Sequence, residues 1–162
     1  MIRSNKLKDY KIIFIAHLNN FSDDEIEVLK KLTEEGVNII ATNQSMADNP
    51  EALKELFGAT VIEKELDAFK YYVQLKDQDI IKRQDKLHQA FLKCNFMKCE
   101  FDPECELYLP LLDKGREGPP EMIGGHVPTG WYGASIFAKN NAKMVYIPWE
   151  IGRMYYQYGF FA

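Results

Sequence analysis

Apolar runs and amphipathic segments alternate along the first part of the chain. Residues 11–16 (KIIFIA) form a continuous apolar run, which is typical of a strand covered on both faces. Ser22-Asp-Asp-Glu25 then forms a capping box, which predicts the start of a helix that Gly36 ends. Residues 37–41 (VNIIA) indicate a second buried strand. A strand, a helix and a strand in this order predict a βαβ unit whose two strands are parallel.

The middle of the chain contains shorter and more mixed segments. Asn49-Pro50 predicts a short helix with Leu53, Leu56 and Phe57 on its apolar face, and Gly58 at its end. Extended segments are expected at residues 59–62, 69–75, 96–101 and 106–109, because they combine aromatic or β-branched residues with turn residues at their ends. Residues 76–91 are highly charged and indicate a loop followed by a modest helix.

A change of composition marks residues 110–130, where proline and glycine accumulate. We expect a long irregular loop there, and loops of that length within a compact domain are often functional. Strands are expected to resume as a hairpin of residues 134–139 and 143–147 across Asn140-Asn141. A final helix is expected to begin at Pro148-Trp149-Glu150.

Length and charge limit the classes of protein to which this chain can belong. The chain has 162 residues, which indicates one domain and is too short for a (β/α)₈ barrel of roughly 200 residues or more. Its net charge of −4 provides no bulk attraction for nucleic acid or an anionic membrane, so neither is expected as a partner. No apolar run approaches the ~18 residues of a membrane helix.

The three cysteines, Cys94, Cys99 and Cys105, favour a reduced protein without a disulfide framework. Together with the absence of a visible signal peptide, they slightly favour a cytoplasmic location. Their spacing is not that of a zinc site, and no GxGxxG or Walker motif follows the first strand. We therefore expect no metal and no cofactor.

Two groups of residues are candidates for chemistry. Ser45 follows the second strand where a nucleophile would lie, but the flanking glycines of a nucleophile elbow are absent. The 110–132 region contains a carboxylate, an imidazole and two aromatic rings, a combination suited to binding sugars. The candidate sugar contacts are Glu121, His126, Trp131 and Tyr132.

The aromatic C-terminus contains more rings than one helix face buries, which indicates contact with another domain or subunit. The candidate interface residues are Trp149, Tyr155, Tyr156, Tyr158 and Phe160.

Three segments, residues 10–42, Pro119-Pro120-Glu121 and residues 143–152 with Tyr155-Tyr156, resemble a known family. They are similar to the class I glutamine amidotransferase-like domain attached to glycoside hydrolases, as in the β-galactosidase trimerisation domain and related C-terminal domains. The resemblance implies an α/β, flavodoxin-like, three-layer domain with a mainly parallel sheet, a C-terminal hairpin and a helix. It also implies that residues 1–162 form a single domain whose first strand–helix unit is missing or lies upstream.

The same resemblance indicates which chemistry is absent. A glutaminase of this family needs a cysteine after Ala41-Thr42 and a His-x-Glu after the last parallel strand. This sequence has Asn43-Gln44-Ser45 and Pro148-Trp149-Glu150 at those places. A nucleophile–base pair cannot be assembled from them, so we expect no amidotransferase activity.

These observations predict a non-catalytic accessory domain of a carbohydrate-active, glycoside hydrolase-like protein. It is expected to contribute to oligomer assembly or to a sugar site, with a catalytic barrel domain or further subunits as its partner. One alternative is an independent small hydrolase that uses Ser45, or Glu121 with His126. A second alternative is a pure protein-interaction module without a ligand.

Overall fold

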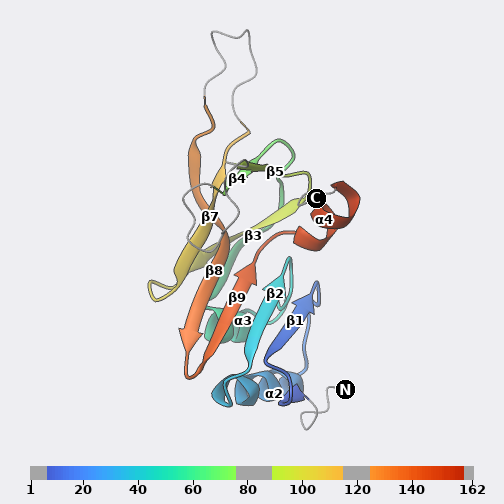
Figure 1. The fold of residues 1–162 in the computed structure, drawn as a ribbon, viewed down its shortest axis with the longest axis vertical. Coiled ribbons are helices and arrows are strands. Elements are labelled where there is room, and N and C mark those ends of the chain that lie inside the picture. The colour runs from blue at the N-terminus through green and yellow to red at the C-terminus, as the bar shows by residue number, and fades with distance from the viewer. Residues whose placement is uncertain (1–6, 76–88, 115–124, 159–162) are drawn as a thin grey trace.

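The computed structural model describes residues 7–75, 89–114 and 125–158, and Figure 1 shows their arrangement. The elements, in chain order, are β1 (Ile12–Ala16), α2 (Asp23–Glu34), β2 (Asn38–Thr42), α3 (Pro50–Phe57), β3 (Ala59–Asp67), β4 (Tyr72–Gln74), β5 (Gln89–Phe91), β6 (Asn95–Phe101), β7 (Glu106–Leu112), β8 (Pro128–Lys139), β9 (Ala142–Ile147) and α4 (Ile151–Tyr158).

The described strands form a seven-stranded mixed sheet and a separate two-stranded sheet. The order in the large sheet is β1-β2-β9-β8-β7-β4-β5, and β3 pairs with β6 in the small one. The β1/β2 and β2/β9 pairs are parallel, whereas the other strand pairs are antiparallel. The large sheet is therefore parallel at the β1 side and antiparallel over the rest of its width.

The prediction of a flavodoxin-like, three-layer α/β fold with a mainly parallel sheet is wrong, because the structure is mostly β. Among the described residues, a direct helical crossover joins neighbouring strands of the large sheet in the βαβ unit of β1, α2 and β2. The chain leaves that sheet after α3 and forms β3, and it reaches β9 through a hairpin from β8. Antiparallel strands and hairpins thus replace the repeated crossovers that a parallel sheet requires.

Several local predictions are confirmed. The Ser22 capping box is present: its hydroxyl accepts from the Glu25 N–H at 3.4 Å, and the Glu25 carboxylate accepts from the Ser22 N–H at 3.1 Å. Gly58 ends α3 with a φ of 62°, in the left-handed region that favours glycine. The hairpin across Asn140-Asn141 also forms. Its first strand begins earlier than expected, at Pro128, so part of the expected irregular loop belongs to β8.

The helix expected within residues 76–91 lies largely outside the described residues, and residues 89–91 form strand β5. The final helix begins at Ile151, after the expected start.

One face of the parallel half of the large sheet carries a core cluster. Ile15, Ile39 and Tyr146 are buried there beneath side chains of α2 and α3, including Leu29 and Leu53. Figure 1 shows α3 behind the strands at this end of the molecule. A second cluster contains buried residues of β6 and β7 together with Trp149 and Met154.

The opposite face of the same strands is less covered. Successive residues of a strand point to opposite faces, so Ile12 and Phe14 lie opposite the buried Ile15. They are 55% and 58% exposed. The register aligns Phe14 with Ile40, Val145 and Ile136 across β2, β9 and β8. We call Ile12, Phe14, Ile40, Val145 and Ile136 the open face.

Candidate functional site

The turn after β2 is where the nucleophile of the alternative hydrolase would lie. Ser45 is fully buried there, and its hydroxyl lies 2.7 Å from the Thr42 carbonyl oxygen and 3.2 Å from that of Ile15. The same hydroxyl accepts from the Leu18 N–H at 3.3 Å. These contacts tie the ends of β1 and β2 together. A side chain without exposed surface and with backbone partners is suited to a structural role, and this argues against a nucleophilic one.

Left-handed backbone is concentrated at the same end of the parallel strands. His17, Asn43 and Met46 have φ values of 50°, 56° and 62°, which are uncommon for residues other than glycine. The side chains of His17 and Asn43 contact each other through Nδ1 and Nδ2. This turn is therefore held in an unusual conformation by contacts between β1 and β2 and the segments that follow them.

His126, one of the predicted sugar contacts, lies just before β8. Its Nδ1 lies 2.8 Å from the carbonyl oxygen of Asp113, and a carbonyl only accepts, so Nδ1 carries the proton. Its ring lies 4.1 Å from that of Tyr72, measured between centroids. The imidazole is thus oriented by a backbone bond and a ring contact. Glu121, its predicted companion, lies outside the described residues.

Trp131 and Tyr132 do not converge on a common point. They are neighbours in β8, so their side chains point to opposite faces of the sheet. Trp131 packs against the second core cluster, and the Lys98 Nζ atom lies 5.8 Å from its ring centroid. One small sugar cannot contact both rings, so Trp131 and Tyr132 do not belong to one sugar site.

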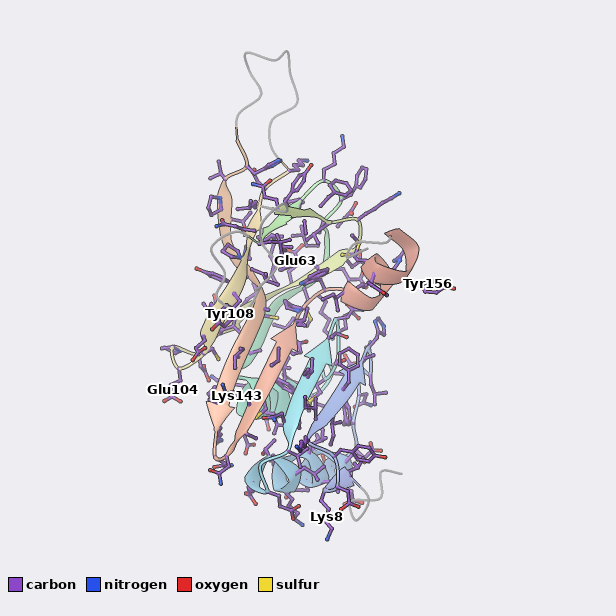
Figure 2. All side chains as sticks on the ribbon, in the orientation of Figure 1. Lys8, Glu63, Glu104, Tyr108, Lys143 and Tyr156 are labelled. Atoms are coloured by element: carbon purple, nitrogen blue, oxygen red, sulfur yellow. The ribbon has the colours of Figure 1, made fainter. Side chains whose placement is uncertain are left out.

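The residues of the predicted aromatic interface also lie in different environments, some in the core and some on the surface. Trp149 is buried, and its indole N–H donates to the Gly133 carbonyl oxygen at 2.8 Å, which makes it a core residue. Tyr155 and Tyr156 are exposed on α4, and Figure 2 shows Tyr156 pointing away from the body of the molecule. The backbone of Tyr158 belongs to α4, whereas Phe160 lies outside the described residues.

A row of four rings lies at the β4/β5 edge of the sheet, and Figure 1 shows that these two strands lie away from β1. The ring centroids of Phe69 and Phe91 are 6.0 Å apart, and those of Phe91 and Tyr72 are 5.4 Å apart. His126 continues the row through its contact with Tyr72. We call Phe69, Phe91, Tyr72 and His126 the ring row. The sequence pattern does not predict this row, because three of its members lie in segments expected to be ordinary strand or helix.

A hollow of about 360 Å³ adjoins the ring row at Phe69. We call it the Arg153 hollow, and its lining residues are Asp67, Phe69, Lys93, Cys94, Asn95 and Arg153. Glu150 fixes one wall, because its carboxylate accepts from the Arg153 guanidinium at 3.1 Å and from the Asn95 N–H at 3.3 Å. The hollow therefore combines an aromatic ring with hydrogen-bonding side chains.

A second hollow, of about 470 Å³, lies between α2 and α3 and is rich in carboxylates. Lys30 pairs there with Glu55 at 2.9 Å, and the hydrogen bond between them raises the pKa of Lys30 and lowers that of Glu55. Within the described ranges, no group of three or more His, Cys, Asp or Glu side chains is arranged to hold a metal ion.

The three cysteines are free thiols. Burial raises the pKa of Cys99 to about 12, and it raises those of Cys94 and Cys105 to about 11. They are therefore protonated at neutral pH, which makes them weak nucleophiles and weak metal ligands.

The described helices include none that is both long enough and apolar enough to span a bilayer.

No protein-family profile and no curated protein matches the sequence. Solved structures do match the fold. The cytoplasmic protein STM3548 from Salmonella typhimurium superposes with a TM-score of 0.63 at 7% identity, over 90% of this chain and 62% of that one.

Glycoside hydrolases are among the other structural matches. Gan42B, a GH42 β-galactosidase from G. stearothermophilus, gives a TM-score of 0.63 at 15% identity, over 93% of this chain and 21% of that one. The exo-β-1,4-mannosidase Op5Man5 from Opitutaceae bacterium strain TAV5 gives 0.60 at 11% identity, over 98% of this chain and 24% of that one. At these identities the likeness concerns the fold alone. This chain thus has the fold of a small part of larger glycoside hydrolase chains.

Proposed function

We propose that this chain is a non-catalytic accessory domain of a carbohydrate-active protein and that it serves in assembly. The structural likeness to a small part of several glycoside hydrolases supports the association with carbohydrate chemistry. The resemblance of residues 143–152 to β-galactosidase trimerisation domains supports the assembly role. The burial of Ser45 supports the absence of catalysis.

The edge strand β1 carries the assembly proposal. Among the described strands, β1 is an outermost strand of the large sheet. Its residues Ile12–Ala16 include no proline and no charged residue. Proteins ordinarily protect such an edge, because its unpaired backbone groups invite another strand. Within the described ranges, β1 carries neither device, and its apolar Ile12 and Phe14 are more than half exposed.

A second copy of the chain is the occupant that fits this edge. The sequence Ile12-Ile13-Phe14-Ile15-Ala16 is nearly symmetric about Phe14 in its apolar character. Antiparallel pairing of two β1 strands centred on Phe14 would therefore place apolar residues opposite apolar residues at every position. Such a two-fold contact uses the same patch on both subunits, as closed dimers do. Ile40 and Val145 of the open face extend the apolar surface beside the contact.

Sedimentation velocity over a wide concentration range, with wild type and Phe14→Asp, tests the assembly role. We expect the wild type to dimerise and Phe14→Asp to weaken the association at least tenfold, because it places two carboxylates at the two-fold axis. Tyr156→Asp tests the other candidate contact, since Tyr156 is exposed on α4 and belongs to the predicted aromatic interface. A wild type that stays monomeric, or a loss of association in Tyr156→Asp alone, would contradict the role of β1.

Turnover of a panel of nitrophenyl glycosides and esters by the same samples tests the non-catalytic part of the proposal. We expect none above the uncatalysed rate. Turnover that Ser45→Ala abolishes would instead support the small hydrolase.

A further inference from the structure

We propose that the ring row and the Arg153 hollow together form a binding site for a neutral glycan chain. The inference rests on the proposed function for its link to carbohydrate, and it deepens that function by naming a ligand class and a site. The ring row lies at the β4/β5 edge, whereas β1 forms the opposite edge of the large sheet. The Arg153 hollow lies where the end of β3 and the start of β6 meet α4, so neither part of the site contains a residue of β1. Glycan binding and assembly can therefore occur on the same molecule.

The ring row provides a contact surface for the apolar faces of sugar rings. Phe69 is 45% exposed, and Phe91, Tyr72 and His126 are half-buried, so the row is anchored yet reaches solvent. Edge-to-face packing holds Phe91 between Phe69 and Tyr72, with interplanar angles of 78° and 68°. The Lys70 ammonium lies 5.7 Å from the Phe69 ring centroid and adds a cation–π contact. A row that is ordered before binding loses little entropy when a ligand arrives.

The imidazole at the end of the row adds a directional acceptor. Because the His126 Nδ1 proton is donated to the Asp113 carbonyl, Nε2 of the neutral ring is an acceptor. A sugar hydroxyl can therefore donate to it while the sugar face rests on Tyr72.

The Arg153 hollow provides the polar partners at the other end of the row. The Asp67 carboxylate accepts from the Phe69 N–H at 3.0 Å through one oxygen, and this bond positions the exposed ring. The Asn95 amide adds a donor to the same space, and the Arg153 guanidinium and the Lys93 ammonium, which also have other partners, lie beside it. Sugars present C–H groups on their faces and hydroxyls around their edges. A ring beside mixed donors and acceptors therefore suits a sugar better than a purely apolar ligand.

The charge of the hollow favours a neutral sugar over an acidic one. Lys93 and Arg153 are the cations of its lining, and Asp67 is its carboxylate. Glu150 lies directly behind Arg153, 3.1 Å from the guanidinium, and offsets its charge. Among the described residues of the lining and its wall, the two positive and two negative charges nearly balance, so an acidic sugar would gain little electrostatic attraction there.

Isothermal titration calorimetry of the full chain with defined oligosaccharides tests the site. The probes are neutral oligomers of β-1,4-mannose, β-1,4-xylose and β-1,4-galactose, with an oligogalacturonate as the acidic comparator. The variant is Phe69→Ala, which removes the exposed ring shared by the row and the hollow. Phe14→Ala is the matched control, because Phe14 is also an exposed phenylalanine but lies at the opposite edge. The thermal transition of each variant confirms folding.

We expect one neutral oligomer to bind the wild type, Phe69→Ala to weaken that binding at least tenfold, and Phe14→Ala to leave it unchanged. Absence of binding by every neutral oligomer would overturn the proposal, as would equal binding by wild type and Phe69→Ala, or a preference for the oligogalacturonate. Sedimentation velocity on the same samples measures assembly separately. Failure of the glycan site would therefore be distinguishable from failure of the assembly role.

Discussion

The Tyr146 hydroxyl in β9 lies 2.9 Å from the carbonyl oxygen of Asn43 and donates to it from the buried centre of the fold. The Ser45 carbonyl oxygen lies 3.1 Å from the same hydroxyl. Burial raises the pKa of Tyr146 well above its ordinary value, so the phenol keeps its proton over the physiological range. One hydroxyl thus fastens the left-handed turn after β2 to the neighbouring parallel strand.

Tyr146→Phe is expected to destabilise the protein by about 1–3 kcal/mol, because it leaves buried carbonyl oxygens without this donor. Urea unfolding at neutral pH measures the change. Tyr156→Phe provides the control, since Tyr156 is 89% exposed and should tolerate loss of its hydroxyl. Equal stability of the two variants would show that the buried hydrogen bond contributes nothing net.

Two buried serines are expected to respond oppositely to removal of their hydroxyls. Ser135 is fully buried, and its Oγ has no hydrogen-bond partner among the described residues, so Ser135→Ala should be neutral or stabilising. The Ser45 hydroxyl bonds the backbone of three residues, so Ser45→Ala should destabilise by about 1–2 kcal/mol. Parallel urea titrations compare them. Greater destabilisation by Ser135→Ala would contradict this assignment.

Gly58→Ala is expected to destabilise more than Gly36→Ala. Both glycines have positive φ, 62° and 86°, so both substitutions incur the left-handed cost of about 1–2 kcal/mol. At Gly58 an added Cβ would also lie 2.6 Å from the Cys105 sulfur, whereas at Gly36 the nearest atom is 3.6 Å away. Thermal unfolding measures both. Adding Cys105→Ala to Gly58→Ala should recover part of the lost stability. If stability does not recover, the additional destabilisation at Gly58 does not come from the contact with the Cys105 sulfur.

Cysteine modification is expected to be slow at neutral pH and to accelerate with alkalinity. Cys105 is half-buried and should react first, since Cys94 and Cys99 are buried. Because its pKa is raised to about 11, its thiolate fraction rises about tenfold per pH unit up to that value. Iodoacetamide labelling followed by peptide mass spectrometry, between pH 7 and 10, measures the rates. A labelling rate that levels off near pH 9 would indicate a thiol with an ordinary pKa. Labelling of the unfolded protein in urea measures the rate of such a thiol for comparison.

Part of the fold could be predicted because its signals are local. The Ser22–Glu25 capping box, the left-handed Gly58 and the turn at Asn140-Asn141 each depend on residues close together in sequence. Backbone hydrogen bonding and φ preference act over a few residues, so these features follow from the pattern alone.

The sheet could not be predicted in the same way. The apolar run of β1 predicts a strand covered on both faces, yet Ile12 and Phe14 are exposed. The pattern of residues 59–62 did not indicate that β3 would extend to Asp67 and pair with β6. Pairing depends on segments far apart in the chain, and a run of apolar residues specifies neither its partner nor its direction.

The sequence by itself determined the capped helix α2, the apolar strands, and the supply of rings, carboxylates and cations available to a site. Only the tertiary structure decided which of them meet: it placed Trp131 and Tyr132 on opposite faces, buried Trp149, and brought Phe69 and Phe91 beside Tyr72 and His126. The physical reason is that side-chain type and local conformation are properties of neighbouring residues. The meeting of side chains depends on strand register and sheet order, which the whole chain establishes together.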